Sequence, residues 1–433
     1  PPMRKRHYGW AIFGLTFADL TAEGGAKGVV PVLFVALREG FGLSATATAA
    51  LFSAAGLVGA LGAPLVGRLL DRMGPRYLFP LGGLLILVGW FASSFVANPW
   101  QLFIFYSLIA ALGENTISSF TATATLAPWF PRTRGRVLGL ADAGNPLGQA
   151  IFVPLAQVLV ATLGWRPTFR IFAICFFLMV APANFLFQRR PPARPAAAIT
   201  MAEGASPNQA MTEFREGQQG ATTDGYAATR MPPLMPLLRR PAVWSLVAAR
   251  LAAATGHHLI TVHLVAFFIA AGYSPLVAAS AIGGAGLFNI LGRPISGAIS
   301  DYLGREVVYT VGLGMQITAI LIVLILGNGQ SLWPLILFVA LSGLSDGIAG
   351  LIVGAKAADL FPPATLGSVM GLVQMGRGVG VMVGPIIGGI LFDLHGDYMI
   401  AFSLAMGLAA LAIGCMWTAN WKAGNPSPPT SSP

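Results

Sequence analysis

The chain has 433 residues, of which 55% are hydrophobic and only 10% are charged, with a formal net charge of +10. Soluble globular domains carry about 25% charged residues, so this composition excludes a soluble fold and favours a membrane protein. A membrane-spanning helix needs about 20 apolar residues, and a chain of this length accommodates about twelve such helices joined by short loops.

Twelve apolar runs follow one another along the chain. They lie near 9–36, 45–68, 77–96, 100–128, 136–162 and 168–187, and then near 241–269, 276–299, 307–327, 332–358, 367–391 and 398–418. The first run follows the basic start MRKRHYGW, which is also how a signal peptide begins. It continues past Asp19, Glu23 and Lys27 without a clear cleavage site, so we expect a retained helix. The pattern predicts an all-α membrane protein of twelve transmembrane helices.

The segment 188–240 interrupts the apolar pattern. It begins QRRPPARP and is rich in small polar residues, so it cannot bury a core of its own. We therefore predict a six-helix bundle at 1–187, a largely disordered linker at 188–240, a second six-helix bundle at 241–420 and a short tail at 421–433.

Basic residues gather in one set of loops. This set includes Arg4, Lys5, Arg6, Arg68, Arg72, Arg76, Arg132, Arg134, Arg136, the arginines of the linker, Arg305 and Lys422. By the positive-inside rule, these loops, the linker and both termini are expected on the cytoplasmic side of the cell (inner) membrane. The same asymmetry accounts for the positive net charge, so no nucleic-acid partner is expected.

The two predicted halves repeat one another in sequence. The stretch GRLLDRMGPR at 67–76 parallels GAISDYLGRE at 297–306, at an offset of 230 residues (297 − 67). The stretch at 129–148 parallels that at 360–380, and Gly139 and Gly371 match at an offset of 232 (371 − 139). Repeated six-helix halves are typical of transporters, which bind their substrate between the halves near the bilayer midplane.

This arrangement resembles the major facilitator superfamily. The loop motif of that superfamily, G-x-x-x-D-R-x-G-x-R, is met in full by Gly67, Asp71, Arg72, Gly74 and Arg76, and in part by Asp301, Gly304 and Arg305. The resemblance implies the major facilitator fold of two pseudo-symmetric six-helix bundles and a secondary transporter. It also implies that this motif acts in structure and gating rather than in substrate contact.

Two arginines lie deep in the spans of the second half. Arg293 follows Asn289 by four residues, hence on the same helix face, and Arg377 occupies the position that Asn145 holds in the first half. A buried arginine keeps its proton and needs an anion, and its planar guanidinium suits a carboxylate. We expect either contact with an anionic ligand or an internal pair with an acid such as Asp346.

Asp19, Glu23 and Lys27 recur every four residues and form one stripe on the first helix. Glu23 and Lys27 either pair with each other, or Lys27 contacts the substrate anion while an acid carries a coupled proton. Glu23 and Asp19 are the candidates for that proton, because a carboxyl removed from water binds a proton more readily.

Several other polar residues lie within the predicted spans. The three histidines of 257–263 lack convincing metal-ligand spacing, and we expect His263 to line the central cavity. Arg250 is expected to pair with a buried acid such as Asp346 or Glu114, and Asp142 to have a structural role. We expect no metal and no cofactor.

Two anion-transporting families share short motifs with this chain. The stretch LFNILGRPISGAISDYLGR at 287–305 resembles helix eight and the following loop of the oxalate–formate antiporter family. That family holds a dicarboxylate with an Arg on helix eight and a Lys on helix eleven, positions on which Arg293 and Arg377 fall. Arg293 and Lys27 also resemble the Arg on helix eight and the Lys on helix one of the monocarboxylate porters, whose helix-eight Asp is replaced here by Asn289. The resemblance implies transport of small organic anions.

We expect a monomer in the lipid bilayer that transports mono- or dicarboxylates by alternating access, coupled either to protons or to anion exchange. An exporter of cationic or lipophilic compounds is the alternative that Glu23, Asp19 and Glu114 support, and the excess of central cations opposes it. A non-transporting solute sensor would need a folded cytoplasmic domain or a long tail. No nucleophile–base pair, metal set or phosphate loop indicates an enzyme.

Overall fold

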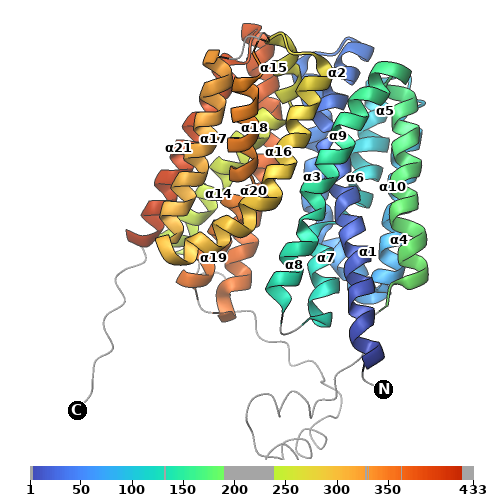
Figure 1. Ribbon diagram of the computed structural model, residues 1–433, viewed down its shortest axis with the longest axis vertical. Coiled ribbons are helices and arrows are strands. Elements are labelled where there is room, and N and C mark those ends of the chain that lie inside the picture. The colour runs from blue at the N-terminus through green and yellow to red at the C-terminus, as the bar shows by residue number, and fades with distance from the viewer. Residues whose placement is uncertain are drawn as a thin grey trace, which may run out of the picture.

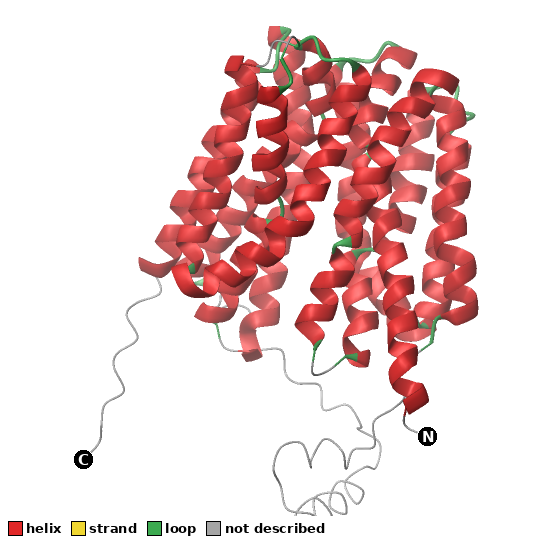
Figure 2. Cartoon of the chain, in the orientation of Figure 1, coloured by secondary structure: helices red, strands yellow, loops and turns green. Residues whose placement is uncertain are grey.

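A computed structural model describes residues 3–130, 133–189, 238–326, 329, 331–361 and 363–421, and every regular element in these ranges is helical (Figure 1; Figure 2). The helices before residue 190 form one bundle. They are α1 (Met3–Gly28), α2 (Val30–Phe41), α3 (Ala45–Met73), α4 (Pro75–Ser93), α5 (Pro99–Leu102), the π-helix η1 (Phe103–Ala110), α6 (Ala111–Thr116), α7 (Ser119–Leu126), the short 3₁₀ helix η2 (Ala127–Trp129), α8 (Arg134–Asp142), α9 (Gly144–Leu163) and α10 (Trp165–Phe187).

The helices after residue 237 form the second bundle. They are α14 (Pro241–Thr261), α15 (Leu264–Ala270), α16 (Pro275–Leu303), α17 (Arg305–Leu326), α18 (Trp333–Ser345), α19 (Ile348–Leu360), α20 (Pro363–His395) and α21 (Met399–Trp421). We call the end of the molecule where α1 begins and α21 ends the termini side, and the opposite end the far side (Figure 1).

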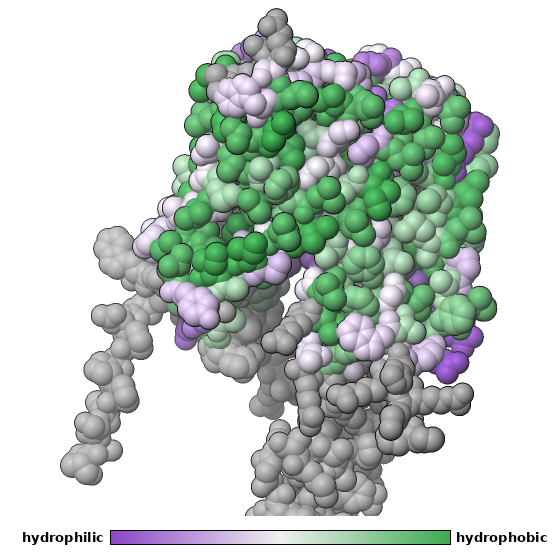
Figure 3. Space-filling view, viewed as in Figure 1, coloured by the Kyte–Doolittle hydropathy of each residue, from purple (hydrophilic) through white to green (hydrophobic). Residues whose placement is uncertain are grey.

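The described helices provide the predicted number of membrane spans. Eleven are long and apolar enough to cross a bilayer, and α14 and α15, bent by 46°, together make a twelfth. Large apolar side chains such as Leu61 and Ile325 are exposed, and Figure 3 shows apolar residues covering the outer flank of both bundles. Lipid accepts such a surface and water does not, so the predicted all-α membrane fold is confirmed.

The structure changes some predicted boundaries. The first span runs from Tyr8 to Phe41 rather than from 9 to 36, with a break at Val29 between α1 and α2. It accommodates Arg38 because that guanidinium lies 4.6 Å from the centre of the Phe392 ring at the far side. Residues 190–237 of the predicted linker and 422–433 of the predicted tail lie outside the described residues.

The sequence repeat is also visible in the backbone. Ser44 caps α3 and Ser274 caps α16, each side chain accepting a hydrogen bond from the third helical N–H, at 3.1 and 3.4 Å. Gly74 ends α3 with φ +77° and Gly304 ends α16 with φ +91°, a region that favours glycine. Both pairs have an offset of 230 residues (274 − 44 and 304 − 74), so the second and eighth spans begin and end alike.

The two bundles are joined mainly along two helix pairs. α3 packs against α20 and α9 packs against α16, and α2 also contacts α15 toward the far side. At Gly389 of α20 an added Cβ would lie 2.7 Å from the Thr46 Cα, so a larger residue would push these helices apart.

The far side of the interface between the bundles is closed. The Asp393 carboxylate at the end of α20 accepts hydrogen bonds from the backbone N–H groups of Ala45 and Thr46, both at 2.9 Å, and from the Thr46 hydroxyl at 2.6 Å. These groups form the N-terminus of α3, where a negative charge is favoured. Toward the termini side the bundles separate, and Figure 3 shows a hollow between their lower ends. Within the described residues, the bundles are thus in contact at the far side and apart toward the termini side.

Candidate functional site

The fourth span of each half is broken at a matched position. In the first half α6 ends at Thr116 and α7 begins at Ser119, and in the second half α18 ends at Ser345 and α19 begins at Ile348. The two breaks, at 117–118 and 346–347, are 229 residues apart (346 − 117). Broken spans in corresponding positions of two halves frequently form the binding site of a transporter, because their helix ends can face a ligand.

Two arginines contact the break in the second half. Gly347 there has φ +81°, and an added Cβ would lie 2.4 Å from the Arg293 Nε. One turn on, an added Cβ at Gly350 would lie 2.9 Å from a terminal nitrogen of Arg250. Glycine at both positions therefore lets two guanidinium groups approach the start of α19. No side chain caps α19 at Gly347, so its helix dipole adds positive potential to the same place.

Arg293 is paired with an acid from the other half of the molecule. Its guanidinium donates a short hydrogen bond to the carboxylate of Asp142 at the end of α8. The two side chains remain 35% and 30% exposed although both lie within spans, so the hollow between the halves reaches them. The Nε of Arg293 is buried and has no hydrogen-bond partner among the described residues. The bond to Asp142 uses one terminal nitrogen, and the side chain is partly exposed, so the exposed part of the guanidinium is available to a further acceptor.

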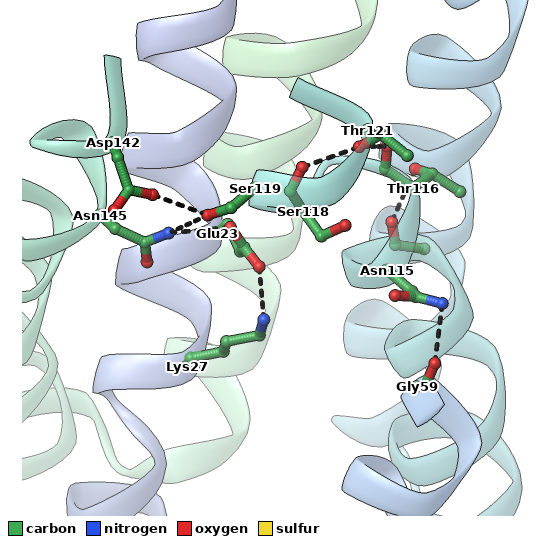
Figure 4. A network of polar contacts seen from close by, with 11 residues as sticks. Glu23, Lys27, Gly59, Asn115, Thr116, Ser118, Ser119, Thr121, Asp142 and Asn145 are labelled. Atoms are coloured by element: carbon green, nitrogen blue, oxygen red, sulfur yellow. Dashed lines mark hydrogen bonds and ion pairs between the residues drawn. The ribbon is translucent and has the colours of Figure 1, made fainter. Parts of the chain in front are cut away.

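A chain of polar contacts runs from Asp142 through the first bundle to Lys27 (Figure 4). Ser119 at the start of α7 donates to the Asp142 carboxylate at 2.8 Å, and the Asn145 amide contacts the Ser119 hydroxyl at 3.4 Å. The same amide donates to Glu23 at 2.9 Å, and Glu23 accepts a short hydrogen bond from Lys27. Lys27 is 53% exposed whereas Glu23 is 4% exposed, so the ammonium group of this pair is the part that meets the hollow.

A second acid lies at the break itself. Asp346 accepts a hydrogen bond from the Asn289 amide at 2.5 Å, and its other oxygen lies 4.0 Å from the His257 Nε2. The Asn289 carbonyl oxygen is buried and has no partner. Arg293 therefore pairs with Asp142 and not with Asp346, the acid named in the sequence analysis. Asp346 is bound instead by Asn289, which lies on α16 as Arg293 does.

Arg377 and Arg250 are the remaining deep arginines. Within the described parts of the chain neither makes a hydrogen bond or an ion pair. The charged neighbours of Arg377 are Glu23, Arg293 and Asp346. Those of Arg250 include Arg377, Asp346 and Arg293. Arg250 was predicted to pair with an acid, and it faces Asp346 only at longer range. Of the three guanidinium groups at the centre, those of Arg250 and Arg377 thus have no ion-pair partner among the described residues.

Two predicted site residues lie away from this cluster. His263 is fully buried, its Nε2 lies 3.0 Å from the Pro385 carbonyl oxygen, and its ring packs 4.6 Å from that of Phe34. It belongs to the contact between the bundles toward the far side. Asp19 is 1% exposed and accepts a hydrogen bond from the Asn184 amide at 2.7 Å, so it lies inside the first bundle, between α1 and α10.

The loop motif lies on the termini side, between the second and third spans of each half. Arg76 donates from Nε to the Phe185 carbonyl oxygen at 3.0 Å, and Arg305 donates from Nε to Asp359 at 3.1 Å. Gly67 lies in the last turns of α3, and Arg72 near its end. The side chains of Asp71 and Asp301 lie outside the described residues. The motif residues are thus separate from the central cluster.

Sequence reasoning missed three parts of the site. It did not pair Asp142 with Arg293, did not include Ser119, and did not predict the two broken spans. The break at 346–347 had a signal, because Ser-Asp-Gly inside an apolar run marks a turn. The break at 117–118 has no glycine or proline and carries no such signal.

Comparison with known proteins gives consistent matches. The model of the Major Facilitator Superfamily matches residues 12–350 and 270–433. Monocarboxylate transporter 13 of Rattus norvegicus is 25% identical over 402 residues, which cover 92% of this chain and 86% of that protein. Monocarboxylate transporter 3 of the same organism is 28% identical over 415 residues, 94% of this chain and 78% of that protein. The crystal structure of a D-xylose–proton symporter has a TM-score of 0.69 at 16% identity and covers 95% of this chain and 97% of that one, so it shares the fold.

Proposed function

The chain belongs to the major facilitator superfamily of transporters, and from that premise we propose that it carries small organic anions, mono- or dicarboxylates, by alternating access. The observation that carries the proposal is the surplus of guanidinium groups at the centre. Arg293 keeps one buried nitrogen unpartnered, and Arg250 and Arg377 make no ion pair with any described residue. The names of the two monocarboxylate transporter relatives agree with this substrate class.

The chemistry of the cluster favours a carboxylate over a neutral or cationic ligand. A guanidinium cannot give up its proton at neutral pH, so each unpaired one in a span leaves a charge that an anion can neutralise. Its planar donors match the two oxygens of a carboxylate. The uncapped start of α19 and the exposed Lys27 add positive charge around the same hollow.

The ion pair between Arg293 and Asp142 suggests how binding is linked to movement. It joins α16 of the second bundle to α8 of the first. A substrate carboxylate that takes the place of Asp142 on Arg293 breaks this link between the halves and allows them to rock about the bound anion. With the basic loops facing the cytoplasm, as the positive-inside rule places them, the conformation described here is open to the cytoplasm.

The energy source is proposed to be either a proton gradient or exchange of one anion for another. Glu23 is the better placed of the two acids predicted to carry a proton. It lies next to Lys27 and is linked to Asp142 through Asn145 and Ser119, whereas Asp19 has no such connection.

Export of cationic or lipophilic compounds is the less favoured alternative. It would need acids that face the hollow without partners. Glu114 is 8% exposed and accepts a hydrogen bond from Trp90 at 3.2 Å, and Asp19 is turned toward Asn184. The acids that do reach the hollow, Asp142 and Asp346, are bound by Arg293 and Asn289.

The test is thermal stability of the purified, detergent-solubilised protein against a ligand panel. The panel holds mono- and dicarboxylates, sugars, amino acids and hydrophobic cations, because a ligand that binds only the folded state raises the melting temperature. We expect stabilisation by one class of carboxylate, lost in Arg293→Ala and largely lost in Arg293→Lys. The matched control is Arg170→Lys, since Arg170 bonds Ser94 elsewhere in the first bundle. Stabilisation by cations or neutral solutes alone would overturn the proposal.

A further inference from the structure

A basic hollow lies on the termini side of the first bundle, away from the central cluster. It has a volume of about 450 Å³ and is formed where the turn between α3 and α4 meets the end of α10. Three of its lining side chains are arginines, Arg72, Arg76 and Arg189, and Tyr77 and Gln188 also line it. The transport function proposed above makes no use of this site.

Gln188 gives the strongest indication that the hollow binds something. Its side chain is completely buried, yet among the described residues neither its amide nitrogen nor its amide oxygen has a hydrogen-bond partner. A buried polar group left unpaired costs about 1–3 kcal/mol, so such groups are normally satisfied by a partner. A ligand with oxygen acceptors in the hollow would satisfy the NH₂ of this amide.

The backbone around the hollow also favours an anion. Helix α4 begins at Pro75 after Gly74, and no side chain caps its N-terminus. Proline has no N–H, and the N–H groups of Tyr77 and Leu78 donate to the Gly74 carbonyl oxygen at 3.3 and 3.1 Å. The Arg76 N–H is therefore the one donor of this helix start that can face an anion, and helix starts favour anions. Arg76 is held in place because its Nε donates to the Phe185 carbonyl oxygen at 3.0 Å, which leaves its terminal nitrogens free for another acceptor.

The surroundings distinguish a lipid from a free anion. The hollow lies at the ends of three membrane spans, where the phospholipid headgroups of one leaflet are found. Directly before Gln188, three large apolar side chains are exposed, Phe185 by 48%, Leu186 by 60% and Phe187 by 55%. Acyl chains can cover these side chains, whereas a free inorganic anion cannot.

We propose that this hollow binds the phosphodiester headgroup of an anionic phospholipid, with Arg76, Arg189 and the Gln188 amide around the phosphate. Basic pockets between spans on the cytoplasmic side are the usual sites of such lipids. The occupant would bridge the turn that carries the loop motif, Gly74 included, to the last helix of the same bundle.

The experiment measures binding to the delipidated full-length protein in a neutral detergent, by native mass spectrometry and by melting temperature. The probes are phosphatidylglycerol, phosphatidylcholine and inorganic phosphate. We expect phosphatidylglycerol alone to bind tightly and to raise the melting temperature. Arg76→Gln and Gln188→Leu should each weaken that binding by about tenfold, the loss of one charge-assisted or buried hydrogen bond.

The matched control is Arg305→Gln, which removes the same charge from the equivalent turn of the second bundle, where Arg305 bonds Asp359. It should bind phosphatidylglycerol as the parent protein does. Equal weakening in this control would mean a general charge effect, and an equal response to inorganic phosphate would mean a free-anion site. Either result would overturn the proposal.

Gln188→Leu also tests the unpaired amide in the absence of lipid. Because the leucine removes a buried amide without a partner, the lipid-free variant should melt at or above the temperature of the parent protein. A clearly lower melting temperature would show that the amide has a partner inside the protein, and would remove the basis for the proposal.

Discussion

The ion pair between Arg293 and Asp142 leads to a prediction about substrate affinity. If a substrate carboxylate binds Arg293, it must first displace the carboxylate of Asp142, and this competition lowers the observed affinity. In Asp142→Asn the competing charge is absent while the size of the side chain is kept. We therefore expect this variant to bind a carboxylate substrate more tightly than the parent protein.

The size of the effect follows from the geometry. Two unit charges about 4 Å apart attract by about 4 kcal/mol at an effective dielectric constant of about 20. The Arg293 and Asp142 side chains are 35% and 30% exposed, so solvent screens the attraction. An ion pair with this degree of solvent exposure contributes about 1 kcal/mol of net stabilisation. Removal of the competitor should then lower Kd by roughly fivefold.

The assay is the dissociation constant of the stabilising carboxylate, measured by titration calorimetry for the parent protein, Asp142→Asn and Asp142→Glu. The glutamate variant keeps the competing charge and should bind like the parent protein. Without ligand, Asp142→Asn should melt at a lower temperature, because Arg293 is then left unpaired. An unchanged or weaker affinity in a folded Asp142→Asn protein would refute the displacement.

Three further predictions concern neighbouring features. In liposome flux assays, Glu23→Gln should abolish substrate accumulation driven by a pH gradient but leave anion exchange intact. Asp19→Asn, which can still accept the hydrogen bond from Asn184, should leave both activities unchanged. The reverse pattern would mean that Asp19 carries the proton. Gly347→Ala should destabilise the protein by about 1 kcal/mol or more, because alanine disfavours the positive φ at this position, and should lower the melting temperature. The added methyl group should also displace the Arg293 guanidinium and abolish carboxylate binding. Normal binding would contradict the close approach of Arg293 to Gly347. Asp393→Ala should remove a helix cap that contributes about 1 kcal/mol, so that the far side opens several-fold more often. Distances between spin labels on the two bundles measure this opening. An unchanged distance distribution would show that the cap does not hold the far side closed.

Much of the fold could be predicted because lipid imposes simple demands on sequence. The spans could be predicted from the length of the apolar runs, and the repeat from the matched loop motif. In the structure, the caps Ser44 and Ser274 at the starts of α3 and α16 show the same repeat. Arg293 could be identified as a candidate site residue because a permanent charge within a membrane span is costly and is usually retained for function.

The partners of the central charges could not be predicted in the same way. Helical spacing places Asp19 and Glu23 on one stripe, but it does not say which neighbour each meets. In the structure Asp19 bonds Asn184 of α10 while Glu23 bonds Asn145 of α9. Asp142 and Arg293 are 151 residues apart, so their contact depends on how the two bundles pack. His263 was placed in the cavity for its polarity, and the bend after α14 turns it into the contact between the bundles instead.

The matched breaks in the fourth spans have a mechanical consequence. Each of these spans consists of two shorter rods connected by a joint, at the level where Arg293 and Asp142 meet. In the rocking movement proposed above, points close to the axis travel least, so an anion bound at the joints would stay nearly stationary while the outer ends of these helices move farthest. The halves of these spans that face the termini side are α7 and α19. If the proposed movement bends the spans at the breaks, this end of the molecule would open or seal while contacts to a ligand at the breaks are preserved.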